Sequence, residues 1–134
     1  MITLTEDMEV VNSILQNAEI WKDIADEGVA PFDIPHKPEL LYYLVNKTEG
    51  VIIVHTFREG CKIHPNILPD KRGVSAYKAV EEVCQELFAL GIPSIYAEID
   101  RQLKHVSLFA RHLGFKMIGL RDRGLFIRTN LTNQ

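Results

Sequence analysis

The stretch HPNILPDKRGVSAYKAVEEVCQELF, residues 64–88, places two prolines and a basic turn directly before an amphipathic helix. Apolar residues in its second half recur at helical spacing, with charged and polar residues between them. This apolar stripe consists of Ala76, Val80, Val83, Cys84, Leu87 and Phe88. Because a helix N-terminus presents unpaired N–H groups and the positive end of the helix dipole, the cationic turn DKRG predicts an anion site at the start of this helix.

The chain before this stretch reads as a strand, a helical region, a loop and three strands. Residues 2–4 form a short strand pattern, and Thr5 is the expected N-cap of a helical region that continues, as one helix or two, to Gly28. Three of the six prolines mark the loop VAPFDIPHKP. The strand patterns LLYYLVN, GVIIVHTF and CKIHPNIL follow, separated by the turns KTEG and REG.

The chain after this stretch alternates strand and helix and ends in a hairpin. The pattern SIYAEID predicts a strand, KHVSLFARHLG a helix, and FKMIGL and GLFIRTNL two strands joined through RDRG. No repeat or linker interrupts the sequence, so we expect a single α/β domain over residues 1–134. Its order is β-α(α)-β-β-β-α-β-α-β-β, which predicts a mixed, mostly antiparallel sheet flanked by helices.

The composition is that of an ordinary globular domain. The 134 residues are 46% hydrophobic and 25% charged, with a net charge of −3. This net negative charge does not indicate binding to the phosphate backbone of a nucleic acid. No apolar run is long enough to predict a membrane span. The two cysteines have no metal-like spacing, and no other pattern indicates a metal site. We therefore expect a cytoplasmic protein that binds neither nucleic acid nor membrane.

The order of these segments resembles the GNAT N-acetyltransferase superfamily. Two stretches carry the likeness: LPDKRGVSAYKAVEEVCQELFALG, where many members have an acyl-CoA motif, and SLFARHLGF, similar to the family's closing helix and Gly-Phe pair. The pattern HP…LP…RG is also similar to small GNAT-like proteins encoded by bacteriophages, which would place the protein in a host cytoplasm or a virion. The resemblance implies acetyl-CoA as acyl donor and transfer of its acetyl group to an amine by direct attack in a ternary complex.

The resemblance also implies where the cofactor binds. In GNAT proteins the strand before the main helix carries a β-bulge and splays from its neighbour, and the cleft receives the pantetheine arm. Pro65 and Pro69 suit such a strand, although they equally suit the two ends of an ordinary edge strand. If the strand CKIHPNIL splays, backbone amides at its end are unpaired, and the cofactor pyrophosphate is expected on the following turn, DKRG. The implied cofactor-binding residues are Ile67, Leu68, Arg72, Gly73, Val74, Ser75, Ala76 and Phe109.

Three positions depart from the family pattern. Tyr77 stands where a glycine or alanine lets the backbone approach the anion, although Ser75 remains able to cap the helix. Ala110 replaces the tyrosine that many members use as general acid, and Leu103 replaces an asparagine. These departures favour an alternative, a catalytically inactive GNAT-fold phage protein that acts in virion assembly or as a protein-binding module.

The chemistry of acetyl transfer requires a base for the ammonium and a donor for the oxyanion. We assign the oxyanion donor to the Leu68 amide. His64 is the preferred base because its ordinary pKa lies near neutrality, although a structural histidine is an equal reading. Glu98 and Asp100 share one face of their strand and are the other candidates, together with His55.

Neither the acceptor nor the oligomeric state follows from the sequence. The acceptor is a small-molecule or protein amine. Trp21 and Phe32 are expected to line the wall of the acceptor site, although burial in the core is the commoner fate of such aromatics. The apolar strand GLFIRTNL predicts a homodimer in which this strand pairs across a subunit boundary.

Overall fold

The computed structural model of the chain describes residues 1–100, 102–120 and 123–130. The elements before the central helix are β1 (Ile2–Thr5), α1 (Met8–Leu15), α2 (Ala18–Ile24), β2 (Leu40–Val45), β3 (Gly50–Phe57), β4 (Gly60–Ile67) and the short 3₁₀ helix η1 (Pro69–Lys71). The remaining elements are α3 (Val74–Ala89), β5 (Ser94–Asp100), α4 (Lys104–His112), β6 (Lys116–Leu120) and β7 (Arg123–Thr129). This order confirms the predicted fold class.

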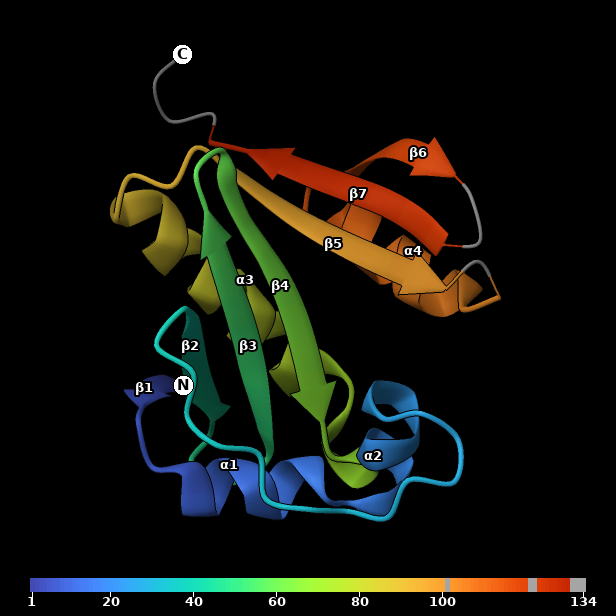
Figure 1. The fold of residues 1–134 in the computed structure, drawn as a ribbon. Coiled ribbons are helices and arrows are strands. Elements are labelled where there is room, and N and C mark those ends of the chain that lie inside the picture. Colours follow the sequence, from blue (N-terminus) through green and yellow to red (C-terminus); the bar gives the residue numbers. More distant parts are fainter. Residues whose placement is uncertain (101, 121–122, 131–134) are drawn as a thin grey trace.

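The seven strands form one mixed sheet in the order β1-β2-β3-β4-β5-β7-β6. All neighbours are antiparallel except β4 and β5, which are parallel. Figure 1 shows β4 and β5 meeting at one end and diverging toward the other, with α3 and α4 behind the sheet. Within the described ranges, no helix has the length and apolar character that a membrane span requires.

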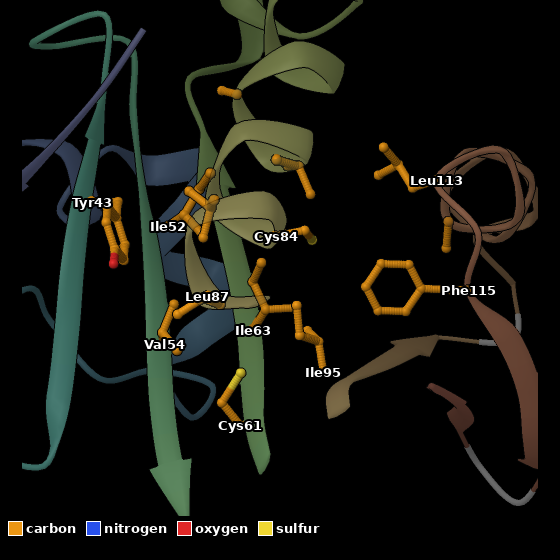
Figure 2. Close-up of a cluster of buried hydrophobic side chains, with 14 of the residues drawn as sticks. Tyr43, Ile52, Val54, Cys61, Ile63, Cys84, Leu87, Ile95, Leu113 and Phe115 are labelled. Carbon is orange, nitrogen blue, oxygen red and sulfur yellow. The ribbon is translucent and has the colours of Figure 1, made fainter. Parts of the chain in front are cut away.

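Two hydrophobic clusters occupy the two faces of the sheet. The larger lies between the sheet and α3 and α4, and it joins Ile52, Ile63 and Ile95 to Leu87 and Phe115. Figure 2 shows these side chains meeting between the strands and the two helices. The smaller lies under α1 and α2 and contains Val11, Ile14, Leu15, Ile20, Tyr42, Leu44 and Val51. We refer to the two sides as the α3–α4 face and the α1–α2 face.

An ion pair fastens α3 to β7. Two guanidinium nitrogens of Arg128 donate to the two carboxylate oxygens of Glu81, one of them over 3.1 Å. The Arg128 side chain is only 16% exposed, and its guanidinium also lies 5.4 Å from the centre of the Phe88 ring. Arg128 is half-buried and its guanidinium is held in two charge-assisted hydrogen bonds, so the pair fixes α3 relative to β7.

The N-terminal boundaries differ from those expected. Asp7, not Thr5, caps α1 by accepting a hydrogen bond from the Glu9 amide, because Thr5 is still paired with Tyr42 in the sheet. The helical region consists of two helices, and α2 ends at Ile24, before Gly28.

The expected dimer strand is not at an edge of the sheet. The strand β7 pairs with β5 on one side and β6 on the other, so GLFIRTNL has no free edge for a second subunit over its described residues. Its last residue, Leu131, and residues 121–122 of the RDRG connection lie outside the described ranges. The free edge at this end of the sheet belongs to β6, where Met117, Ile118 and Leu120 are exposed.

Candidate active site

The two central parallel strands separate soon after they meet. The β4–β5 ladder contains only the pairs Cys61–Ile95 and Lys62–Tyr96, although both strands continue for several residues beyond. The opposite edge of β4 stays paired with β3 along its whole length, from Gly60 to Ile67. The strand therefore splays from β5 as expected (Figure 1). We call the stretch beyond Lys62 and Tyr96, where the two backbones no longer pair, the opening between β4 and β5.

The β-bulge that the resemblance implies in this strand is absent. The β3–β4 register runs without a shift from Phe57–Gly60 to Gly50–Ile67. Gly50 makes this close pairing possible, because a Cβ there would lie 2.7 Å from Ile67 Cδ1 and 2.8 Å from the Asn66 carbonyl oxygen. The opening therefore results from the divergence of β5 and not from an irregularity in β4.

The register decides which amides face the opening. The Leu68 N–H donates to the Glu49 carbonyl over 3.0 Å, so the expectation that this amide is free to bind an oxyanion is wrong. Because antiparallel pairing alternates, every second residue of β4 turns its N–H the other way, toward β5. Beyond the last β4–β5 pair these are Ile63, Pro65, which has no N–H, and Ile67. The Ile63 N–H still belongs to the parallel pairing of Lys62 with Tyr96, because that pairing directs it to the Tyr96 carbonyl. The Ile67 N–H is therefore the one strand amide of β4 that the register directs into the opening.

The proline positions follow from the same geometry. Pro65 lies inside a central strand, but its nitrogen faces the side on which no ladder partner is present. Pro69 begins η1, where a missing N–H has no consequence. The prolines thus mark a strand that is central at one end and has a free edge at the other.

The N-terminus of α3 lies at the C-terminal end of β4 and is not capped by any side chain. Its N-cap is Gly73, with φ at 130°, and its first turn contains no acidic residue. In contrast, α1 and α2 are each capped by a side chain, from Asp7 and Asn17. Tyr77 is the first residue of α3 whose N–H bonds back to Gly73, so the amides of Val74, Ser75 and Ala76 have no acceptor within the helix.

The side chains around this N-terminus leave donors available. Ser75 is in the first turn and does not cap the helix; its Oγ accepts a hydrogen bond from Asn46 Nδ2 over 2.9 Å, so its own hydroxyl proton is left to donate. Arg72 Nε donates to the Ile67 carbonyl over 3.2 Å, which places the guanidinium beside the end of β4. Val74 is 72% exposed and Ala76 is buried in the core, so they contribute backbone only.

Tyr77 turns away from the backbone of its own helix. Its ring packs edge-to-face on Phe109 of α4, with ring centres 5.0 Å apart. Its hydroxyl donates to the His112 carbonyl over 3.2 Å. Tyr77 therefore lies between α3 and α4, and Phe109, which we expect at the cofactor site, contacts Tyr77.

The candidate bases lie on the α1–α2 face. His64 and Glu98 share this face with Lys62, because Cys61, Ile63 and Ile95 point into the core on the other side. Glu98 Oε1 lies 2.6 Å from Lys62 Nζ, and Glu98 Oε2 lies 4.0 Å from Arg123 Nη1. The hydrogen bond from Lys62 lowers the pKa of Glu98, which makes this carboxylate a weaker base than expected.

His64 is an exposed residue of β4 whose pKa is lowered by its surroundings. The pKa of His64 lies below its ordinary value of 6.5, first because neighbouring atoms desolvate the ring and then because of the charges of Lys62 and Arg123. The imidazole is therefore neutral near physiological pH although it lies at the surface. Asp100 shares the face but is exposed, and its Oδ1 accepts from the Gln102 amide over 2.9 Å.

Lys62 is the site residue that the sequence analysis does not single out. A lysine in a strand has no distinguishing pattern, and its partner Glu98 follows 36 residues later. The signal is the alternation within β4, which places Lys62 and His64 on one face. Within the described part of the chain, no group of three His, Cys, Asp or Glu side chains is arranged to hold a metal ion.

The expected acceptor wall lies near α2. Trp21, Val29 and Phe32 line a hollow of about 250 Å³, in which Trp21 Nε1 donates to the Val29 carbonyl over 2.9 Å. Trp21 is buried and Phe32 is 55% exposed, so only Phe32 offers much of its ring to a ligand. A second hollow lies between α1 and residues 33–35. Neither hollow includes a residue of β4 or β5.

Comparison with known proteins shows the fold. No protein-family model and no curated protein matches the sequence. A Bacillus subtilis acetyltransferase in complex with CoA is similar in structure, with a TM-score of 0.71, 16% identity, and 97% of this chain and 98% of that chain covered. A probable acetyltransferase of the GNAT family from Chromobacterium violaceum has a TM-score of 0.69 at 16% identity, covering 96% and 82%. A spermidine N-acetyltransferase from Vibrio cholerae has a TM-score of 0.72 at 11% identity, covering 96% and 92%.

Proposed function

We propose that this chain, which has the fold of the GNAT acetyltransferases, is an acyl-CoA-dependent N-acetyltransferase that acts on an amine. One observation carries the proposal: β4 and β5 separate beyond Lys62 and Tyr96, and the uncapped N-terminus of α3 lies at the end of the separated strand. An opening with a free strand amide suits an extended amide-containing arm. A helix N-terminus with three unpaired amides suits a pyrophosphate.

The residues present fit acetyl-CoA as the donor. The pyrophosphate would be held by the amides of residues 74–76, by the Ser75 hydroxyl proton and by Arg72, whose guanidinium lies beside the same turn. The Ile67 N–H would bond the arm of the cofactor or the carbonyl oxygen of its acyl group. The bound cofactor would supply the acetyl thioester on which the amine acts.

The groups for proton transfer lie on the other side of the sheet. We assign His64 as the base that removes a proton from the ammonium of the acceptor, because its imidazole is neutral near physiological pH. Glu98 remains ionised and bonded to Lys62, so it positions charge near His64 and is not itself the base. Asp100 stays a weaker candidate because it already accepts the Gln102 amide.

The oxyanion donor that we propose is the amide of Ile67, one residue before the expected Leu68. The Leu68 amide is paired with Glu49, whereas the Ile67 amide faces the opening, so Ile67 takes this role. Ala110 is buried and carries no transferable proton, so this position of α4 supplies no general acid. In direct attack within a ternary complex, the amine nitrogen would bond to the thioester carbon, and the Ile67 N–H would stabilise the oxyanion so formed. The carbon–sulfur bond would then break, the second proton of the amine would pass to solvent, and solvent would protonate the departing thiolate.

The acceptor is an amine that approaches from the α1–α2 face, where His64 and the exposed ring of Phe32 lie. Both small-molecule and protein amines remain acceptors to be tested. A panel should include spermidine, because one structurally similar protein is a spermidine N-acetyltransferase.

The test is titration calorimetry of the purified protein with acetyl-CoA and with CoA, followed by a thiol-release assay over the amine panel. We expect saturable binding with a dissociation constant in the micromolar range. An absence of binding up to millimolar ligand would contradict the proposal. The protein would then have this fold without binding acyl-CoA, which is the alternative of a catalytically inactive protein-binding module.

A further inference from the structure

Asn46 connects the turn between β2 and β3 to the first turn of α3. Its side-chain Nδ2 donates to Ser75 Oγ over 2.9 Å. Its Oδ1 accepts from the Met1 nitrogen over 2.8 Å, and its backbone N–H donates to the Met1 carbonyl over 2.8 Å. Because a donor faces Oδ1, the side-chain amide has one orientation, with Nδ2 toward Ser75. We call this chain of contacts from Met1 through Asn46 to Ser75 the amide bridge.

The backbone of Asn46 has a conformation that few side chains adopt. Its φ is 44°, and Lys47 follows with φ at 71°. This left-handed region is costly for most residues, and asparagine is one of the few with a side chain that enters it readily. Glycine would adopt the same turn without strain, but it would leave Ser75 without its donor. Asparagine at this position therefore supplies both the turn and the bond to Ser75.

The bond to Asn46 decides what the Ser75 hydroxyl can do. An amide nitrogen only donates, so Ser75 Oγ accepts, and within the described part of the chain nothing accepts the proton of this hydroxyl. Side chains of a helix tilt toward its N-terminus, so Ser75 Oγ lies on the side to which the unpaired amides of residues 74–76 point. Ser75 is also exposed, so a ligand at this end of α3 can accept the proton.

We propose that Asn46 is a positioning residue for the acyl donor: it holds Ser75 as a hydrogen-bond acceptor, so that the Ser75 hydroxyl donates to the pyrophosphate at the start of α3. The inference rests on the proposed function, because it concerns the same ligand. Asn46 acts through Ser75 and does not itself contact the cofactor. The Met1 nitrogen also lies 3.4 Å from Glu82 Oε1, so the amide bridge meets α3 at two places.

The first experiment is a double-mutant cycle on CoA binding, measured by calorimetry. Asn46→Gly keeps the left-handed turn and removes the side chain, so we expect affinity about threefold weaker. Ser75→Ala removes a donor to a charged ligand, so we expect affinity about tenfold weaker. The double variant should bind as Ser75→Ala does, because Asn46 acts only through the hydroxyl. Thr48→Gly, at an exposed position of the same turn, is the control and should bind as the wild type does.

A second experiment reverses the polarity of the amide bridge. Asn46→Asp has nearly the shape of asparagine, but its carboxylate only accepts, so the Ser75 hydroxyl would donate to it and not to the ligand. We expect CoA binding about tenfold weaker than in the wild type, which is weaker than in Asn46→Gly. All proteins are compared at about 0.5 M salt, where repulsion between exposed charges is largely screened. If the bond served only to fasten α3 to the turn, Asn46→Asp would keep it and bind as the wild type does.

The inference requires both results. An effect of Asn46→Gly that disappears in the Ser75→Ala background, together with weaker binding in Asn46→Asp than in Asn46→Gly, supports it. Additive losses in the double variant, or wild-type affinity in any of the three single variants, overturn it while leaving the cofactor site in place. No CoA binding by the wild-type protein overturns the inference and the proposed function together. Urea denaturation without ligand verifies that each variant is folded under the conditions of the titration.

Discussion

Lys62 Nζ and Glu98 Oε1 lie 2.6 Å apart across the point at which β4 and β5 stop pairing. The last backbone pair of the two strands is Lys62–Tyr96. The Lys62–Glu98 ion pair is therefore a side-chain contact between the strands just beyond the last backbone pair. Both side chains are about one-third exposed, at 29% and 36%. The pair therefore connects the strands where the opening begins and places two charges next to His64.

The first prediction concerns the pKa of His64. Replacing Lys62 by methionine removes a positive charge that disfavours the imidazolium, so the pKa of His64 should rise. Replacing Glu98 by glutamine removes a negative charge that favours the imidazolium, so the pKa should fall. An NMR titration of the imidazole protons measures both shifts, with Lys78→Met on the exposed side of α3 as control. Shifts of the same sign in the two variants would contradict this electrostatic account.

A second prediction tests Arg72 at the mouth of α3. The change Arg72→Glu reverses the charge beside the proposed pyrophosphate position and should weaken acetyl-CoA binding about tenfold or more. Lys71→Glu makes the same charge change one residue away and serves as the matched control. Calorimetry on both variants separates a specific contact from a general charge effect. Equal affinities of the Arg72 variant and the wild type would remove Arg72 from the site.

The third prediction tests the register of β4 through its proline. Pro65→Ala adds an N–H that faces the opening and breaks no ladder bond, so the free energy of unfolding should change by less than about 1 kcal/mol. Asn66→Pro removes an N–H that the register directs to β3, and it should lower that free energy by about 2 kcal/mol more than Pro65→Ala does. Urea denaturation of the two variants gives the comparison. Similar stabilities would mean that the alternation along β4 is the reverse of the one described.

The fourth prediction concerns the pH dependence of stability through the Glu81–Arg128 pair. The hydrogen bonds from Arg128 lower the pKa of Glu81 in the folded chain. A carboxyl group with a lowered folded pKa stabilises the fold above its unfolded pKa, and this stabilisation is lost as the pH falls through the folded value. Glu81→Gln should therefore lower the free energy of unfolding by about 1 to 2 kcal/mol near neutral pH. The deficit should shrink below about pH 4, and urea denaturation at both pH values would show whether it does.

The element pattern was predictable from the sequence because local signals agreed with the fold. The spacing of Val80, Val83 and Leu87 predicts the buried side of α3, and all three are buried. Glycines and prolines mark most of the boundaries. The predicted N-cap of α1 at Thr5 is wrong because Thr5 pairs with Tyr42 in the sheet, a tertiary contact that local sequence does not reveal.

The candidate site was predictable only in part because it depends on register and on distant partners. The face shared by His64 and Glu98 follows from alternation within each strand. The direction of each backbone amide depends on which residue of β3 lies opposite. Periodicity contains no such information, so it does not distinguish the Leu68 amide from the Ile67 amide. The orientation of Tyr77 toward α4 likewise depends on the packing of two helices that are far apart in the sequence.

The two edges of β4 differ, and this asymmetry has a thermodynamic consequence. Gly50 and the Glu49 carbonyl hold one edge against β3, whereas the other edge is already free beyond Lys62. A ligand that added itself along the free edge would not have to displace a strand first. The ordering entropy of binding would then fall on the flexible ligand and not on the sheet, which is what a preorganised backbone achieves.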